Sequence, residues 1–330
     1  MTEIKKVLVT GASGFIGRAL CEKILTKGWQ VRGIFRTGSD LSRLPDGVEA
    51  FLIAAIDSDT NWVDALSGID TVVHLAARVH IMDDPSVDPL VEYRKVNVEG
   101  TRCLGIAAAK AGIKRFVYIS SIKVNGEGRA SAYTEDDDEA PEDPYGLSKW
   151  EAEQELHKIA DKSSIEVVII RPPLVYGPGV KANFLRLLKI VKCGIPLPLA
   201  SIKNQRSFIY LENMVDAIIT CINRSKAAGH TFLVSDGKNI STPELIKQIA
   251  MAMGKPALLF SIPPFLIQLA GKFTGKSSAI DRLLDSFTID SSRIRKELEW
   301  NPPYTMKEGI EVTVHGCGSQ LTVSKYRNPC

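Results

Sequence analysis

The sequence predicts an α/β fold, a doubly wound parallel sheet followed by a smaller, mostly helical C-terminal lobe. Short β-branched runs alternate with longer helical patterns through the first half of the 330 residues, which is typical of βαβ units. After RPPLVYGPG (171–179) proline and glycine become more frequent and the alternation weakens. We therefore expect a change of organisation near this point of the chain.

The elements follow in order along the chain. Strands are expected at residues 7–10, 30–35, 49–53, 71–75, 115–120, 166–171 and 230–234. Helices are expected where apolar residues recur at three- and four-residue intervals, at residues 14–27, 88–111 and 145–160. This order assigns residues 1–176 to a nucleotide-binding domain, with a return contribution from about 203–235, residues 177–202 and 236–315 to a substrate lobe, and residues 316–330 to a loose tail.

Composition and charge favour small-molecule partners. The net charge is only +3 and the 41 Lys and Arg residues are spread along the chain, so nucleic-acid binding is not expected. The six cysteines show no CxxC pairing, which favours reduced thiols in a cytoplasmic protein and no metal site. IPPFLIQLAG (262–271) is too short to span a bilayer, although peripheral association with a membrane-bound partner stays open. The acidic run 135–143 is expected to be a solvated loop.

A glycine-rich turn follows the first predicted strand and opens the first predicted helix. VLVTGASGFIG places Gly11, Gly14 and Gly17 where a tight turn lets backbone N–H groups approach a pyrophosphate. The alternative is a merely structural turn, but the strand–turn–helix context favours a Rossmann-type dinucleotide site. The residues expected to contact the cofactor here are Gly11, Ser13, Gly14, Phe15, Ile16 and Gly17.

A tyrosine and a lysine lie one helical turn apart in YGLSK. Tyr145 and Lys149 therefore share a helix face, and a nearby ammonium would favour the phenolate and bring the tyrosine toward neutral pH. YISSIKVNG ends a predicted strand, so Ser120 or Ser121 projects toward the same crevice. A hydroxyl there can bind a substrate oxygen while the tyrosine moves its proton.

Taken together, these motifs resemble those of extended short-chain dehydrogenases/reductases of the nucleotide-sugar epimerase/dehydratase group. The matching segments are TGASGFIG, DTVVHLAA (70–77), NVEGT (97–101), SSIKVNG (120–126), PYGLSK (144–149), RPPLVYGPG, RSFIYLENMVDA (206–217) and SSRIRKELEWNP (291–302). The resemblance implies that Tyr145 is the acid/base, that Lys149 lowers its pKa and holds the nicotinamide ribose, and that Ser121 binds the reacting sugar oxygen. It also implies cofactor contacts from Leu75, Ala76, Ala77, Asn97 and Pro172, whereas His74 is expected to be a satisfied buried histidine.

The sequence departs from the family pattern at four places. Asn125 replaces a tyrosine, Lys123 adds a cation beside the serine, Leu174 replaces an asparagine, and Ala55 stands where an adenine-binding Asp is expected, with Asp57 two residues on. The resemblance further implies a UDP-sugar substrate. Its expected contacts are Ser121, Lys123, Asn183, Phe184, Arg206 and Arg282, with a surface ion pair as the alternative for the two arginines.

Arg36 bears on the choice of cofactor. NAD enzymes commonly place an acid at the end of the second strand for the ribose 2′-hydroxyl, whereas an arginine attracts a 2′-phosphate. Here Phe35 takes the place of the acid and Arg36 follows. We therefore favour NADP(H), with NAD(H) and a solvent-facing Arg36 as the alternative.

The whole chain is most similar to O-antigen cluster proteins of this group, and some of these resemble reductases of UDP-4-keto-6-deoxy-N-acetylglucosamine. The leading hypothesis is that NADPH-dependent 4-reductase, which would make UDP-N-acetylquinovosamine for lipopolysaccharide. The alternative is a 4-epimerase of UDP-glucose or UDP-N-acetylglucosamine. A non-catalytic dinucleotide sensor is a third possibility, although such proteins usually lack part of the Ser/Tyr/Lys set. The resemblance also suggests a homodimer through the helices that begin near Asp88 and Tyr145.

Overall fold

The computed structural model describes residues 5–42, 44–79, 88–273 and 283–317. Its centre is a seven-stranded parallel sheet of order β3-β2-β1-β4-β5-β6-β9. The strands are β1 (Lys6–Thr10), β2 (Gln30–Arg36), β3 (Val48–Ile53), β4 (Thr71–His74), β5 (Arg115–Ile119), β6 (Glu166–Arg171) and β9 (Thr231–Leu233). The predicted doubly wound parallel sheet is confirmed.

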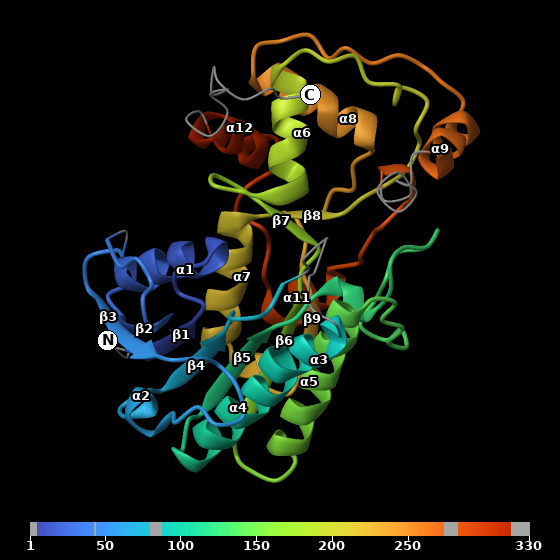
Figure 1. The fold of residues 1–330 in the computed structure, drawn as a ribbon. Coiled ribbons are helices and arrows are strands. Elements are labelled where there is room, and N and C mark those ends of the chain that lie inside the picture. The colour runs from blue at the N-terminus through green and yellow to red at the C-terminus, as the bar shows by residue number, and fades with distance from the viewer. Residues whose placement is uncertain (1–4, 43, 80–87, 274–282, 318–330) are drawn as a thin grey trace.

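Helices cover both faces of this sheet (Figure 1). On one face lie α1 (Phe15–Thr26) and α7 (Leu211–Asn223), which share a hydrophobic core with the apolar side chains of β1 and β6. On the other lie α2 (Val63–Leu66), α4 (Gly100–Lys110) and α5 (Pro144–Ala160), around a second core. Because both faces are covered, the central strands are apolar on both sides rather than alternating.

The stretch 88–111, expected as one helix, consists of three pieces. Asp88 caps α3 (Pro89–Tyr93), a π-helical turn η1 (Arg94–Glu99) follows, and α4 continues the helix. π-turns insert an extra residue per turn and are frequent at functional sites. Here the turn carries Asn97, whose side chain bonds the loop after β4.

The second lobe stands above the carboxyl ends of the strands (Figure 1). It contains α6 (Ala182–Lys192), α8 (Thr242–Ala252), α9 (Pro264–Phe273) and α12 (Met306–Gly316), and a two-stranded sheet of β7 (Leu174–Tyr176) and β8 (Phe208–Tyr210) connects it to the main domain. The chain then returns to the main domain, since α7 packs on α1, β9 extends the sheet and α11 (Ser292–Leu298) packs beside β9. The residue limits of the two domains stay a prediction.

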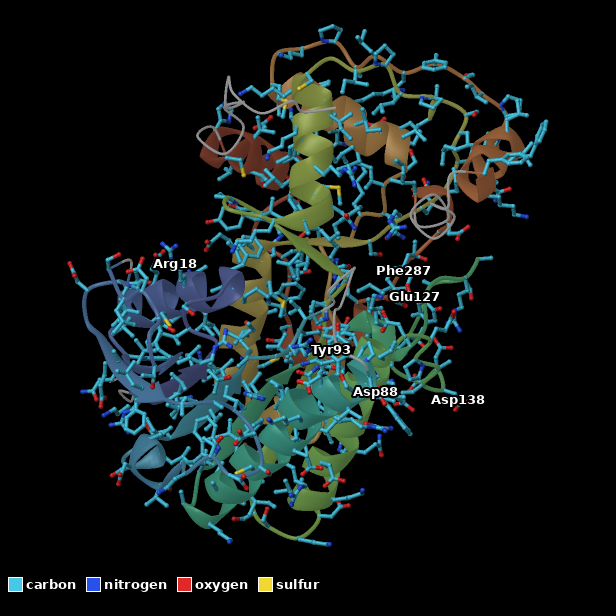
Figure 2. The ribbon with its side chains drawn as sticks, viewed as in Figure 1. Arg18, Asp88, Tyr93, Glu127, Asp138 and Phe287 are labelled. Atoms are coloured by element: carbon cyan, nitrogen blue, oxygen red, sulfur yellow. The ribbon has the colours of Figure 1, made fainter. Side chains whose placement is uncertain are left out.

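Of two sequence-based expectations about loops, one is wrong and the other is incomplete. The tail does not begin at residue 316, because Gly316 is the last residue of α12 and Cys317 is fully buried. The acidic run 135–143, part of the loop that Figure 2 marks with Glu127 and Asp138, is not simply solvated. Most of its residues are exposed in a loop before α5, as expected, but several carboxylates are paired. Glu135 accepts from Leu233 N, Glu139 pairs with Arg171, Asp143 caps α5, and Asp137 pairs with Arg129 within the loop.

Other expectations can be compared directly. The five cysteines within the described ranges are unpaired. In the same part of the chain no group of three or more His, Cys, Asp or Glu side chains could hold a metal ion. The described helices are all too short or too polar to cross a bilayer.

A buried ion pair ties α5 to the sheet. Arg171 at the end of β6 donates from Nε and Nη2 to the two carboxylate oxygens of Glu153, at 3.1 and 2.5 Å, and both side chains are almost fully buried. Arg171 also donates to Asn125 Oδ1 at 3.1 Å and to Glu139. Both charges of the pair therefore have several hydrogen-bond partners inside the protein.

We expect Glu153→Ala to lower the free energy of unfolding by about 3–5 kcal/mol, because it leaves the Arg171 guanidinium buried without its main partner. Urea denaturation measures this. The control is Glu155→Ala, on the same helix, which removes an exposed pair with Lys158 and should cost about 1 kcal/mol or less. Equal losses in the two variants would contradict the structural importance of the buried pair.

Candidate active site

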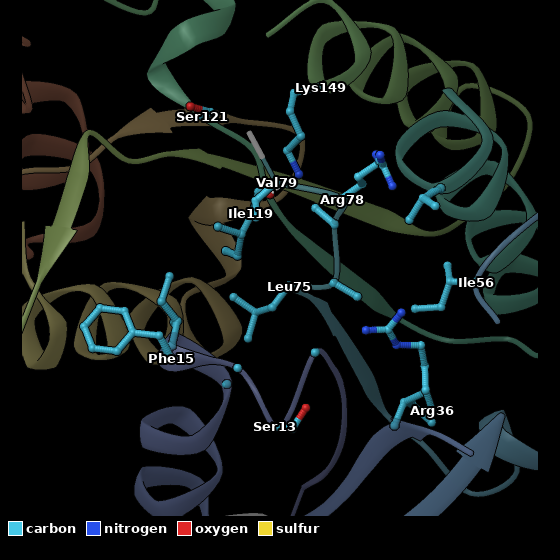
Figure 3. Close-up of a pocket in the computed structure, with 18 of the residues that line it drawn as sticks. Ser13, Phe15, Arg36, Ile56, Leu75, Arg78, Val79, Ile119, Ser121 and Lys149 are labelled. Atoms are coloured by element: carbon cyan, nitrogen blue, oxygen red, sulfur yellow. Dashed lines mark hydrogen bonds between the residues drawn. The ribbon is translucent and has the colours of Figure 1, made fainter. Parts of the chain in front are cut away.

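A cavity of about 860 Å³ lies at the carboxyl edge of the sheet. It lies where the connections from neighbouring strands β1 and β4 run to opposite faces, the position at which doubly wound sheets bind ligands. Figure 3 shows Ser121 and Lys149 at one end of the cavity, with Ser13 and Arg36 at the other. All the predicted glycine-turn residues line it, as do Arg36, Leu75, Ala76, Ala77, Ser121, Tyr145, Lys149 and Pro172.

The glycine turn is shaped to approach a ligand closely. Gly11 has φ of +67°, and a Cβ there would lie 2.9 Å from Ala76 N; a Cβ on Gly17 would lie 2.1 Å from Gly11 O. Gly14 caps α1 without a side-chain hydrogen bond, so the first N–H groups of the helix point outward with their partial positive charge. A tight glycine turn that leads into a helix N-terminus can bind a pyrophosphate through these N–H groups.

His74 holds the neighbouring loop in place. Its ring nitrogens lie 2.6 Å from Thr10 Oγ1 and 3.0 Å from Thr101 Oγ1, and burial lowers its pKa to about 3. Thr10 Oγ1 already accepts from Leu75 N and Ala76 N, so its own proton goes to Nδ1 and Nε2–H donates to Thr101. The prediction of a satisfied buried histidine is confirmed.

Asn97 does not line the cavity, but it hydrogen-bonds the backbone of Arg78, which does. The Asn97 amide accepts from Arg78 N at 2.8 Å and donates to Arg78 O at 3.0 Å and to Ser148 Oγ at 2.9 Å. It thereby joins the loop after β4 to α5. The contact is with the protein backbone that lines the cavity, so Asn97 is a positioning residue.

Tyr145 and Ser121 lie together at the end of β5. Tyr145 is in the first turn of α5, and its phenol hydrogen-bonds the Ser121 hydroxyl. Burial raises the pKa of Tyr145, the Asp143 carboxylate and the Tyr93 hydroxyl raise it further, and Ser121 opposes them. The ring of Tyr93 also packs edge-on against it at 6.0 Å. Lys149, which the sequence predicts to lower the pKa of Tyr145, is not one of the groups that shift it here.

Lys149 is buried beside the same cavity. Its Nζ donates to Ile119 O at 2.6 Å and lies 4.2 Å from the centre of the Tyr118 ring. Burial lowers the pKa of Lys149 to about 7, while the Glu153 carboxylate acts in the opposite direction. Lys149 can therefore be neutral or charged near neutral pH, which suits a group that relays a proton.

An ion-pair chain borders the Ser/Tyr pair. Lys123, two residues after Ser121, contacts Asp143 and donates to Glu127 Oε1 at 2.7 Å. Asp143 Oδ1 in turn accepts from Gly146 N at 2.6 Å and caps α5. Lys123, expected to bind substrate, is therefore held by two carboxylates.

The opposite end of the cavity carries Arg36 and Asp57. The Arg36 guanidinium extends toward Ile56 (Figure 3), and Phe35 is buried beneath the sheet edge. Asp57 lines the cavity with Ala55, but its Oδ1 accepts from Asp59 N and Thr60 Oγ1 within its own turn. The Arg36 guanidinium thus extends over the cavity, whereas the Asp57 carboxylate accepts hydrogen bonds within its own turn.

The expected substrate contacts in the lobe do not line this cavity. Phe184 belongs to the core, with its ring stacked at 5.3 Å on Tyr176, and its contact with substrate stays a prediction. Asn183 is exposed at the start of α6. Arg206 donates to Asp285 O at 3.3 Å and lies 5.9 Å from the Phe287 ring. Arg282 lies outside the described residues.

Several charged lining residues were missed from the sequence. Arg78 follows the HLAA segment directly and lies 5.6 Å from the Tyr93 ring, and Glu92 and Lys95 reach the cavity from α3 and η1. Arg78 could have been found, because it follows a strand end in the matched segment. The π-turn that places Lys95 has no sequence signal of its own.

Ser120 also lines the cavity, and its buried Oγ has no hydrogen-bond partner within the described part of the chain. A buried hydroxyl without a partner is costly and is expected to bind a ligand or water. With the outward N–H groups of α1 and the close approach at Gly11, it makes the lining compatible with a nicotinamide dinucleotide.

Comparisons with known proteins agree with this geometry. The chain is 45% identical over 313 residues to a UDP-glucose 4-epimerase of Vibrio cholerae, with 94% of each chain covered. It is 28% identical to the N-acetyl-alpha-D-glucosaminyl-diphospho-ditrans,octacis-undecaprenol 4-epimerase of Escherichia coli O157:H7, over 93% of this chain and 94% of that protein.

Solved structures with the same fold contain nucleotides. MoeE5 in complex with UDP-glucuronic acid and NAD is 28% identical, with a TM-score of 0.75 and 96% and 99% of the two chains covered. The model of the NAD dependent epimerase/dehydratase family matches residues 7–235, which include the glycine turn and the Ser/Tyr/Lys set. The chain therefore belongs to the NAD-dependent epimerase/dehydratase family.

Proposed function

We propose that this protein is a nicotinamide-dependent 4-epimerase of a UDP-hexose such as UDP-glucose. The observation that carries the proposal is that Ser121, Tyr145 and Lys149 face one cavity with the glycine turn. Both curated relatives described above are named 4-epimerases, which supports the epimerase over the reductase favoured by the sequence. Pairing of two subunits through α3 and α5 is part of the same proposal.

The residues of the chain divide the chemistry between them. When bound, the nicotinamide would take the hydride from sugar C4 and return it to the opposite face of the 4-keto sugar. The Ser121 hydroxyl would hydrogen-bond O4 and hold it against the phenol. Tyr145 would receive the O4 proton and later give it back, and Lys149, with its pKa near 7, would take up or release charge as the phenol changes state.

The test is conversion of UDP-glucose to UDP-galactose by the purified protein with added NAD. Tyr145→Phe should lower kcat by about 10²–10⁴, because it removes the proton-transfer group. Tyr304→Phe, which changes a tyrosine outside the cavity lining, should leave kcat unchanged. Undiminished turnover by Tyr145→Phe would contradict the assigned role.

The second candidate is the NADPH-dependent 4-reductase, with its role in surface polysaccharide synthesis. Arg36 supports it, because this cation lines the cavity at the end of β2, where a 2′-phosphate would lie. The two candidates separate when NADPH and UDP-4-keto-6-deoxy-N-acetylglucosamine are supplied together. Net loss of nicotinamide absorbance favours the reductase, whereas sugar interconversion without net loss favours the epimerase.

Arg36→Ala gives an independent test of cofactor choice. If the guanidinium binds a 2′-phosphate, the variant should raise the KM for NADPH by about tenfold or more, because a charge-assisted contact is lost, and the KM for NADH by much less. Arg224→Ala, at an exposed arginine far along the chain, is the control. Equal changes for the two cofactors would remove this support for NADP(H).

The pH dependence should report Asp143. Because its carboxylate disfavours the nearby phenolate, Asp143→Asn should lower the pKa of Tyr145, and the limb of kcat/KM that needs the phenolate should move to lower pH. Asparagine still caps a helix, so α5 should remain intact. Other polar groups near the phenol are Ser121, Tyr93, Lys149 and Tyr118, and Lys123 pairs with Asp143 beside them.

Glu142→Gln is the matched control for this change. Glu142 accepts from Glu127 N on the same loop and is not among the groups that shift Tyr145. A shift of the same size in both variants, or a shift to higher pH in Asp143→Asn, would contradict the electrostatic effect assigned to Asp143.

A further inference from the structure

The lobe above the sheet carries apolar side chains on its outer side. In α9, Phe265, Leu269 and Phe273 follow one another at four-residue intervals, which places them on one helix face. Their exposed fractions are 63%, 47% and 83%. Ile267 faces the other way and packs against the hydrophobic core. α9 is thus anchored by one face and presents an apolar face to the solvent.

Three further exposed apolar side chains lie within or shortly before α9 in the sequence. Leu258, Phe260 and Leu266 are each more than 40% exposed. α9 stands at the outer end of the lobe, away from the sheet (Figure 1). Clustered exposed apolar residues mark an interaction surface, whereas single ones need no explanation.

Two segments of the same lobe carry only basic charge, although the basic residues of the whole chain are spread evenly, as expected from the sequence. Residues 177–203 contain five Lys or Arg and residues 245–280 contain four, and neither segment contains Asp or Glu. The rest of the chain holds 32 Lys and Arg against all 38 Asp and Glu. The exposed cations among the nine are Lys181, Arg186, Lys189, Lys203, Lys247, Lys255 and Lys272.

We propose that α9 and its basic surroundings dock this protein on an anionic lipid bilayer. Interfacial helices bury Phe and Leu at the boundary between headgroups and acyl chains, as the Phe265, Leu269 and Phe273 stripe can. Each nearby Lys or Arg adds attraction to anionic lipid headgroups. The proposed association is peripheral, through the α9 face and the cations around it.

An acidic protein partner or a second copy of the chain are the competing occupants. A second copy is disfavoured because the seven exposed cations of these two segments would face the same cations of that copy, and the segments contain no acid to pair with them. A membrane offers an apolar acyl-chain region for the Phe265, Leu269 and Phe273 stripe and anionic headgroups for the lysines.

The test is sedimentation of the purified full-length protein with vesicles. It should bind vesicles of equal parts phosphatidylglycerol and phosphatidylcholine, bind pure phosphatidylcholine far more weakly, and be released by high salt. Phe265→Ser/Phe273→Ser should weaken binding about tenfold or more, because two aromatic anchors are lost. Leu52→Ser/Val63→Ser, which changes two exposed apolar residues of the other domain, should bind as the wild type does.

The readout needs no substrate, so it is independent of the proposed epimerase activity. Turnover of the nucleotide sugar in solution should be the same for the wild type and both double variants, which shows that they are folded. Three outcomes would overturn the proposal: no binding to either vesicle, equal binding by the two double variants, or loss of a dimer in light scattering of Phe265→Ser/Phe273→Ser, which would identify a second copy as the occupant.

Discussion

The parallel register of β1, β4, β5 and β6 is the constraint on which the site depends. Thr10 pairs with His74, His74 with Tyr118, and Ile119 with Ile170. Because these strands end level with one another, the segments that follow them meet at one edge: Gly11 to Gly14, Leu75 to Ala77, Ser120 and Ser121, and Pro172. The cavity is therefore built from residues far apart in sequence that share only their position after a strand.

α5 links this edge to the core through one helix face. Tyr145, Lys149 and Glu153 follow at four-residue intervals, so the face runs from the cavity wall into the buried ion pair with Arg171. Asp143 caps the same helix and contacts Lys123 from the serine segment. This face of α5 is therefore anchored at both ends, by the Asp143 cap and by the Glu153–Arg171 pair. The two anchors fix the Tyr145 phenol relative to Ser121.

The sequence is sufficient for features that depend on local periodicity and on residues following strands. It predicts the strands, the glycine turn and the Ser/Tyr/Lys set because each has a characteristic spacing along the chain, which can be recognised without knowing the tertiary contacts. It does not predict that Phe184 packs on Tyr176, since an aromatic side chain suits a core as well as a ligand. Nor does it predict the low pKa of Lys149, which comes from burial, or the contacts of the acidic run, whose partners lie on other elements.

The charge of the lobe and the stripe on α9 have different physical consequences. A basic surface attracts any anion, including a nucleotide sugar diphosphate, so the seven exposed cations alone would be consistent with steering of substrate toward the cavity. A small anion gains nothing from Phe265, Leu269 and Phe273, which are exposed on a face opposite to the anchored Ile267. Only a partner with both negative charge and an apolar interior uses both features, and a bilayer surface has this combination over an area as large as the lobe.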